Sequence, residues 1–285
     1  MISSAGKLFN KITSHFSENI DFYRGGIYNN RKKENGDLIK MGNILSCFKE
    51  KKPIIGVIHA KGTDDEDMME RAVSEINTYI ENGIDGILVE TYFGTYHQVR
   101  MILDYLRKND FGVPYGVNCL NVDAMGFVLA NEYGCKFIQL DSVIGHVKPR
   151  DEESLSAFLE YARARCDAYV MGGVRFKYQP VLSEKSTEED LITAKERCDA
   201  VCVTEDATGQ ETSLGKIMKF RDTLGDFPLF VCAGVTPKNV AEQLKYADGA
   251  VVGSYFKDNH KDTGDVYGPH VAEIMDIVRE VRKGK

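Results

Sequence analysis

The sequence has no tryptophan, only seven prolines among 285 residues, and no run of 18 consecutive apolar residues. Without such a run the chain offers no candidate for a membrane-spanning helix, so we expect no stable membrane insertion. The N-terminus lacks the apolar stretch of a signal peptide, which predicts a cytoplasmic protein. The apolar fraction (43%) and the charged fraction (28%) exclude disordered, collagen-like and coiled-coil proteins as the main class.

The seven cysteines form no C-x-x-C motif, and their odd number argues against a disulfide framework. Most of them, such as Cys202 and Cys232, stand in apolar runs, which is typical of buried thiols in a reducing compartment. The H-E-x-x-H and Walker A motifs are also missing. We therefore expect no zinc site and no tightly held transition metal.

Acidic residues outnumber basic ones by 43 to 36, which gives a formal net charge of −7. A general nucleic-acid binder is usually basic, so we expect no nucleic-acid partner. The charge is uneven, because residues 1–52 sum to +5 and residues 53–285 to −12. We interpret residues 1–52 as a basic N-terminal extension, either a solvated arm or a docking segment. Apolar residues at the spacing of one short helix occur in it, namely Leu8, Phe9, Ile12 and Phe16.

From residue 53 onward, short apolar runs alternate with segments of helical periodicity. The runs cover residues 54–60, 86–91, 115–120, 137–141, 168–174, 200–204, 229–233 and 250–254. Runs that are apolar throughout are typical of parallel strands covered on both faces. Eight strand–helix units in succession predict an α/β fold, a (β/α)8 TIM barrel over residues 53–285. An open doubly wound sheet is the alternative.

Two local signals support this division of the chain. An aspartate followed by a small residue precedes four of the runs, at Asp85, Asp167, Asp199 and Asp248. Thr236 followed by Pro237 predicts the start of a helix, with the threonine as N-cap.

Barrels of this kind carry function at the carboxyl ends of their strands, and polar residues end nearly every apolar run. Glu90, Asp141 and Asp206 follow the second, fourth and sixth runs, so we expect their carboxylates to converge on one axial site. Such carboxylates serve as acid and base or hold Mg²⁺ beside a substrate phosphate, which makes Mg²⁺ a candidate cofactor. The candidate catalytic residues are Glu90, Asp141, His59 and Asp206.

The loops after the last two runs are rich in glycine, which lets backbone N–H groups approach an anion closely. Many barrels bind a substrate phosphate with these loops, whereas the alternative is that the glycines only make tight turns. The candidate phosphate-binding residues are Gly234, Val235, Gly253 and Ser254. The candidate substrate-binding residues are Asn118, Asp123, Lys177, Thr204, Thr208 and Gly209. Lys177 either neutralises an anion or forms a Schiff base.

Several motifs, taken in this order, resemble the BtpA family. They are Ile55-Gly-Val-Ile-His59, Asp85-Gly-Ile-Leu-Val-Glu90, Gly116-Val-Asn118 with Asp123-Ala, Ala200-Val-Cys-Val-Thr204 with Thr208-Gly209, and Gly234-Val-Thr-Pro-Lys-Asn239 with Asp248-Gly-Ala-Val-Val-Gly253. The resemblance implies a TIM barrel of the phosphate-binding type, and the family takes its name from photosystem I biogenesis. The chain departs from the family pattern after His59, where a short acidic loop follows, and at Val174-Arg-Phe-Lys177, where a histidine is missing.

Two functions of different classes fit these residues. The first is an enzyme that acts on a small phosphorylated metabolite, resembling a sugar or ribosyl phosphate, by lyase, isomerase or glycosyl-type acid–base chemistry. The second is a non-catalytic BtpA-like assembly or regulatory factor that binds partners through its N-terminal arm. We expect a small anionic substrate and a homo-oligomer.

Overall fold

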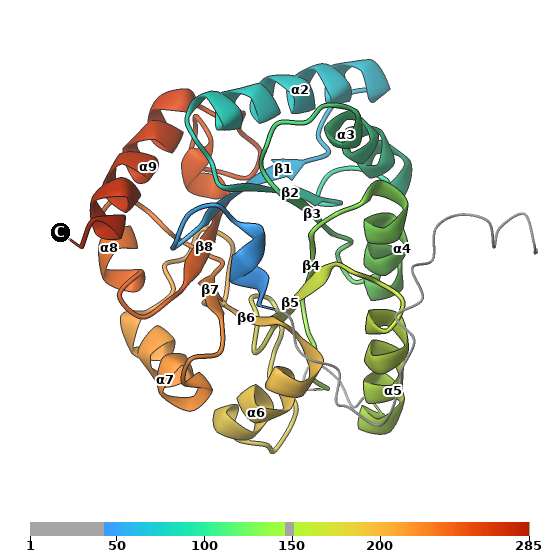
Figure 1. Ribbon diagram of the computed structural model, residues 1–285, viewed down its shortest axis with the longest axis vertical. Coiled ribbons are helices and arrows are strands. Elements are labelled where there is room, and N and C mark those ends of the chain that lie inside the picture. Colours follow the sequence, from blue (N-terminus) through green and yellow to red (C-terminus); the bar gives the residue numbers. More distant parts are fainter. Residues whose placement is uncertain (1–42, 146–150, 285) are drawn as a thin grey trace, which may run out of the picture. The chain divides into compact units, whose positions relative to one another are not determined.

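The computed structural model describes residues 43–145 and 151–284, and within them eight parallel strands form a closed barrel (Figure 1). The strands are β1 (Ile54–His59), β2 (Gly86–Glu90), β3 (Tyr115–Asn118), β4 (Phe137–Leu140), β5 (Tyr169–Gly173), β6 (Ala200–Val203), β7 (Leu229–Val231) and β8 (Gly249–Val252). Each strand pairs with its neighbours in chain order, and β1 also pairs with β8. This closure confirms the predicted TIM barrel and excludes the open doubly wound sheet.

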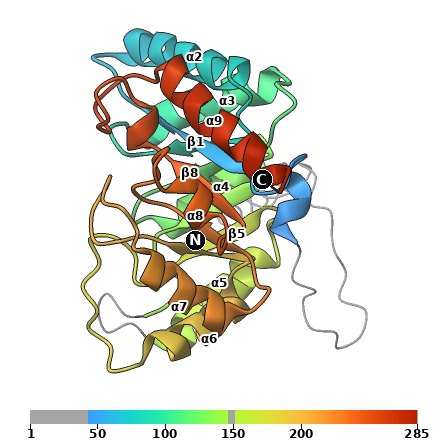
Figure 2. The same cartoon turned by 90° about the vertical axis from the view of Figure 1, so that its left-hand side faces the viewer.

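Helices follow the strands and surround the barrel (Figures 1 and 2). They are α2 (Asp65–Glu81), α3 (Tyr96–Lys108), α4 (Asp123–Tyr133), α5 (Glu152–Arg163), α6 (Thr187–Arg197), α7 (Leu214–Leu224), α8 (Val240–Gln243) and α9 (Gly268–Arg282). Their apolar stripes face the sheet, which keeps the strands buried on their outer side. None of the helices in the described part is long and apolar enough to cross a membrane.

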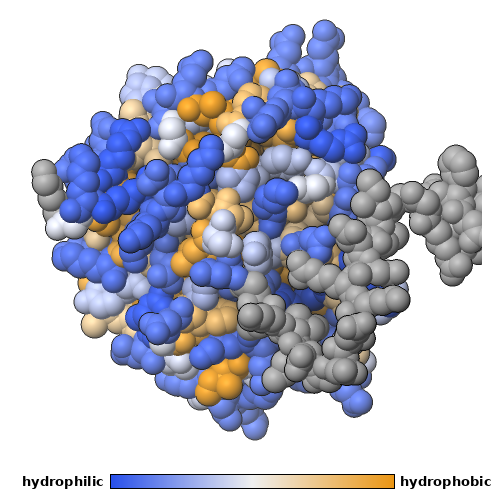
Figure 3. Space-filling model, in the orientation of Figure 1, coloured by the Kyte–Doolittle hydropathy of each residue, from blue (hydrophilic) through white to orange (hydrophobic). Residues whose placement is uncertain are grey.

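A short 3-10 helix, η1 (Ile44–Cys47), lies at the amino end of the barrel, the end that faces the viewer in Figure 1. Ile44 is fully buried and Phe48 nearly so, and both belong to the cluster that fills the barrel interior. The Phe48 ring lies 5.9 Å from the ring of Phe137 and 6.4 Å from that of Phe230. In the space-filling view of the same face, side chains fill the centre (Figure 3). The core of the barrel thus includes residues that precede the expected boundary at residue 53, whereas residues 1–42 lie outside the described ranges.

The aspartates that precede the strands explain part of the internal repeat. Asp85, Asp199 and Asp248 each accept a hydrogen bond from a backbone N–H of the preceding strand and from an arginine guanidinium. The N–H donors belong to Ile54, Val170 and Leu229, and the guanidinium donors to Arg282, Arg163 and Arg221. Each carboxylate therefore ties two neighbouring strands and a helix together at the amino end of the barrel.

Helix α8 begins later than the sequence predicts. Its N-cap is Asn239 rather than Thr236, and it contains only four residues. The Asn239 side chain accepts a hydrogen bond from the Thr236 N–H (2.7 Å) and donates one to the Gly234 carbonyl (2.9 Å). These contacts stabilise a turn in place of the first predicted helical turn. Because four residues sum few peptide dipoles, the loop after β7 lacks the strong helix dipole that the sequence suggested.

Candidate functional site

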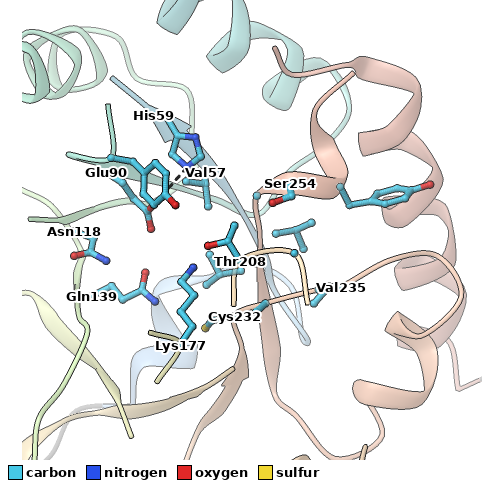
Figure 4. Close-up of a pocket in the computed structure, with 18 of the residues that line it drawn as sticks. Val57, His59, Glu90, Asn118, Gln139, Lys177, Thr208, Cys232, Val235 and Ser254 are labelled. Carbon is cyan, nitrogen blue, oxygen red and sulfur yellow. Dashed lines mark ion pairs between the residues drawn. The ribbon is translucent and has the colours of Figure 1, made fainter. Parts of the chain in front are cut away.

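A cavity of about 140 Å³ opens at the carboxyl ends of the strands. Eleven of the fourteen predicted site residues line it, so the structure brings most of them together. Those eleven are His59, Glu90, Asn118, Asp141, Lys177, Thr208, Gly209, Gly234, Val235, Gly253 and Ser254. In Figure 4, Glu90, Asn118 and Gln139 stand on one side of the cavity, and Thr208, Val235 and Ser254 stand on the other. The Lys177 side chain reaches into the space between them.

His59 and Glu90 form an ion pair where β1 and β2 end side by side. The distance between His59 Nε2 and Glu90 Oε2 is 3.5 Å, and His59 Nδ1 lies 3.1 Å from the Asp262 carbonyl oxygen. Both ring nitrogens thus face acceptor oxygens, an arrangement suited to a proton donor. Burial acts to raise the pKa of Glu90, but hydrogen bonds from His59 and Asn118 and the charges of His59 and Lys177 together outweigh it, so the pKa lies below its usual value. Glu90 is therefore ionised at neutral pH.

Asp141 follows β4 and accepts a hydrogen bond from Asn118 Nδ2 at 3.1 Å. Burial raises the pKa of its carboxyl to about 6, although the Asn118 amide and the Lys177 charge act in the opposite direction. The negative charge of Glu90 contributes to the increase. The two carboxyl groups of the cavity therefore have pKa values that their surroundings move apart, which is typical of acid–base pairs in enzymes.

Lys177 enters the cavity from the loop after β5. Its backbone N–H donates to Thr204 Oγ1 at 2.7 Å, and Thr204 is fully buried. Thr204 does not line the cavity, so it acts on the site by fixing the loop that carries Lys177. The ammonium charge of Lys177 acts to lower the pKa of both Glu90 and Asp141.

The loops after β7 and β8 offer backbone donors to the opposite side of the cavity. Within the described ranges, the N–H groups of Gly234, Val235, Gly253 and Ser254 donate no hydrogen bond. Gly234 has a φ of +63°, and a Cβ atom there would lie 2.2 Å from the Gln210 carbonyl oxygen, so only glycine fits. Backbone N–H groups without partners are the donors that form anion-binding concavities in proteins. In this loop pair no long helix begins at the donors.

Two predicted residues lie elsewhere. Asp206 is exposed and lines a second cavity, of about 560 Å³, beside Arg175 and Lys216. Asp123 is the first residue of α4 and does not line the first cavity. The expected convergence of three carboxylates is therefore incomplete, since Glu90 and Asp141 meet in one cavity and Asp206 faces another. In the described part, no three His, Cys, Asp or Glu side chains come close enough to hold a metal ion.

Sequence reasoning missed Gln139, which lines the cavity and is only 2% exposed. It stands in the middle of β4, in Phe-Ile-Gln-Leu, where it is the one polar residue of an otherwise apolar strand. A polar residue in the middle of an apolar strand could have identified Gln139 from the sequence, because a buried polar side chain needs a partner. Tyr92 and His260 were missed as well, since both belong to loops whose path the sequence does not reveal.

Solved structures of low sequence identity share the fold. Thiamine phosphate pyrophosphorylase from Pyrococcus furiosus superposes with a TM-score of 0.57 at 15% identity, covering 81% of this chain and 96% of the other. Phosphoribosyl anthranilate isomerase from Thermus thermophilus gives a TM-score of 0.55 at 11% identity, with coverages of 80% and 99%. N-acetylneuraminate lyase from Fusobacterium nucleatum gives 0.56 at 12% identity, with coverages of 82% and 76%.

Comparison of amino-acid sequences finds relatives of higher identity than these solved structures. An uncharacterised protein of Pyrococcus abyssi is 27% identical over 257 residues, which cover 81% of this chain and 97% of that protein. The photosystem I biogenesis protein BtpA of Synechocystis is 24% identical over 270 residues, with coverages of 85% and 93%. The BtpA family as a whole matches residues 50–280, which include all eight strands and every residue of the cavity. The chain belongs to the BtpA family.

Proposed function

We propose that the protein is an enzyme that acts on a small phosphorylated metabolite by acid–base chemistry of the lyase, isomerase or glycosyl-transfer type. One observation carries the proposal. Two carboxyl groups with pKa values moved in opposite directions share a cavity with four backbone N–H groups that have no partner in the described part. The first feature suits proton transfer, and the second suits the binding of an anion.

The phosphate binds to the loops after β7 and β8. The residues of these loops line the cavity before any ligand binds, and their backbone N–H groups have no partner in the described part, so little conformational entropy is lost on binding. The Ser254 hydroxyl lines the same side and adds a further donor. This arrangement holds the non-reacting end of the substrate and directs its carbon skeleton toward the strands β2 to β4.

Proton transfer takes place at the other side of the cavity. Asp141, with a pKa of about 6, is ionised at neutral pH and still basic enough to accept a proton. Glu90 stays ionised, orients the His59 ring and stabilises positive charge that develops beside it. Lys177, whose side chain lies between the two sides, neutralises negative charge on the substrate as it forms.

The fold neighbours support this proposal only in a general way. Two of them are named for phosphorylated compounds, thiamine phosphate and phosphoribosyl anthranilate, and a third is a lyase of a sugar acid. Since fold does not determine function, the argument depends on the cavity and its charges.

A Glu90→Gln variant tests the proposal. We expect it to bind inorganic phosphate like the wild type, measured by ³¹P NMR titration, because the phosphate loops are unchanged. In D₂O, a panel of three- to six-carbon sugar phosphates followed by ¹H NMR should show exchange or conversion with the wild type. The variant should be slower by at least a factor of about 100, because His59 loses the carboxylate that orients its ring and stabilises the positive charge developing beside it. Equal rates would remove Glu90 from the mechanism, and failure of the wild type to bind phosphate would overturn the proposal.

A second function is favoured by one relative, whose name assigns it to photosystem I biogenesis. Under this reading the protein is a non-catalytic assembly or regulatory factor, and its N-terminal extension binds the partner. Deleting residues 1–42 distinguishes the two functions. If the protein is an enzyme, the deletion variant should bind phosphate and turn over substrate like the wild type. If it is a non-catalytic factor, even the wild type should turn over no compound of the panel.

A further inference from the structure

Gln139 is a buried polar group that the proposed mechanism does not use. Its side chain is only 2% exposed, yet its carbonyl oxygen, Oε1, has no hydrogen-bond partner in the described part of the chain. An amide oxygen buried without a partner destabilises a folded protein, so such groups are uncommon outside functional sites. Gln139 lines the cavity and Figure 4 shows it directed into the cavity, on the side of Asn118.

The Gln139 side chain also interacts with Cys202 of β6. A hydrogen bond from it acts to lower the pKa of the Cys202 thiol, which burial raises far above its usual value. A hydrogen bond with that effect is donated to the sulfur, so it involves the amide nitrogen. The amide oxygen is the atom of Gln139 that is left without a partner in the described part of the chain.

We propose that Gln139 recognises a hydroxyl group of the substrate, so that the substrate class is a small phosphate ester with a free hydroxyl on its carbon skeleton. An unpartnered carbonyl oxygen accepts only from a donor, which a ligand O–H supplies. A cationic amine is disfavoured there, since the Lys177 ammonium enters the same cavity. The inference rests on the proposed function, because it takes the phosphate to lie on the loops after β7 and β8.

The dimensions of the cavity and a second buried oxygen agree with such a ligand. The cavity measures about 140 Å³, close to the roughly 150 Å³ of an engineered cavity that holds one benzene molecule, so it accommodates a short carbon chain. Thr208 lines the cavity on the side opposite Gln139, and its hydroxyl oxygen is buried there, near the hydroxyls of Tyr92 and Tyr178. A hydroxylated chain that starts from the phosphate can therefore meet acceptors on both sides.

A matched pair of ligands tests the inference independently of the natural substrate. Glycerol 3-phosphate and n-propyl phosphate have the same three carbons and differ in two hydroxyl groups. We expect the wild type to bind glycerol 3-phosphate about tenfold more tightly, measured by calorimetry or ³¹P NMR, because an apolar chain leaves Gln139 unpartnered. In Gln139→Met, an apolar replacement of similar volume, this preference should fall to less than about twofold while inorganic phosphate binds unchanged.

The controls separate recognition from folding. Gln243 is equally buried and also has an unpartnered Oε1, but it lies on α8 outside the cavity, so Gln243→Met should keep the full preference. Gln139→Leu serves as a second apolar variant if Gln139→Met does not fold. Equal binding of both esters by the wild type, or an undiminished preference in the Gln139 variants, would overturn this inference alone. If inorganic phosphate and both esters all fail to bind the wild type, the proposed function falls as well.

Discussion

Acidic side chains occur at both ends of the barrel, and the two ends use them differently. At the amino end, Asp199 accepts two hydrogen bonds from Arg163 and one from the Val170 N–H, so both oxygens have strong donors. At the carboxyl end, Asp141 accepts a hydrogen bond from the Asn118 amide, and the pKa of its carboxyl is raised to about 6. The negative charge of an aspartate is thus compensated by a guanidinium and a backbone N–H at the amino end. At the carboxyl end it is compensated only in part.

The difference separates a structural role from a functional one. A carboxylate with a guanidinium and a backbone donor stabilises the strands that it joins and has little capacity left for chemistry. A carboxylate whose charge is poorly compensated costs stability, and enzymes accept that cost where the group must exchange a proton. Burial alone therefore does not distinguish the two roles of a carboxylate, whereas the completeness of its pairing does.

The largest effect on stability is expected at the amino end. Asp199→Ala removes the carboxylate that pairs with the Arg163 guanidinium, whose side chain is only 10% exposed, and that accepts from the Val170 N–H. Breaking such a pair by removing one partner costs about 3–5 kcal/mol of unfolding free energy, which urea denaturation measures. The exposed Asp222 on α7 provides the control, since Asp222→Ala should change stability by less than about 0.5 kcal/mol. A loss below about 1 kcal/mol for Asp199→Ala would show that the amino-end contacts do not stabilise the barrel.

A smaller effect of opposite sign is expected at the carboxyl end. The pKa of Asp141 is about 6 in the folded protein and about 3.9 in an unfolded chain, so above pH 6 its ionised form destabilises the fold. Asp141→Asn should therefore be more stable than the wild type by about 2–3 kcal/mol at pH 7.5. Between pH 6 and pH 4 the folded wild type binds a proton that the unfolded chain does not, so its stability rises as pH falls and the difference disappears. Urea denaturation at pH 7.5, 6, 5 and 4 measures this, and parallel stability curves would contradict it.

The smallest effect is expected at Asp206, which the sequence groups with Glu90 and Asp141. Because Asp206 is exposed and lines the second cavity, Asp206→Asn should change stability by less than about 0.5 kcal/mol. Phosphate affinity and turnover on the sugar phosphate panel should also stay within about twofold of the wild type. A loss of turnover comparable to that of Glu90→Gln would place Asp206 in the mechanism after all and would extend the site toward the second cavity.

Most of the fold and much of the site could be predicted from single positions along the chain. Glu90, Asp141 and the glycines after the last two strands were found because each directly ends an apolar run. Gln139 was not found, since within one strand its direction into the barrel is visible only once the sheet closes. Asp206 was grouped with Glu90 and Asp141, but the loop after β6 places it at the second cavity, and loops carry no periodicity that would reveal this.

The sequence by itself determined the architecture, since eight alternations of apolar runs and amphipathic helices leave few ways to bury the strands on both faces. It also determined the amino-end contacts in outline, through the repeated aspartates. Only the tertiary structure decided which polar groups share a cavity. Glu90 ends β2, whereas Gln139 lies in β4 and Asp141 directly follows it. Their pKa values and missing partners depend on distances between segments far apart in the chain. Local pattern specifies burial, whereas the electrostatics of a site arise from burial and charge summed across the whole barrel.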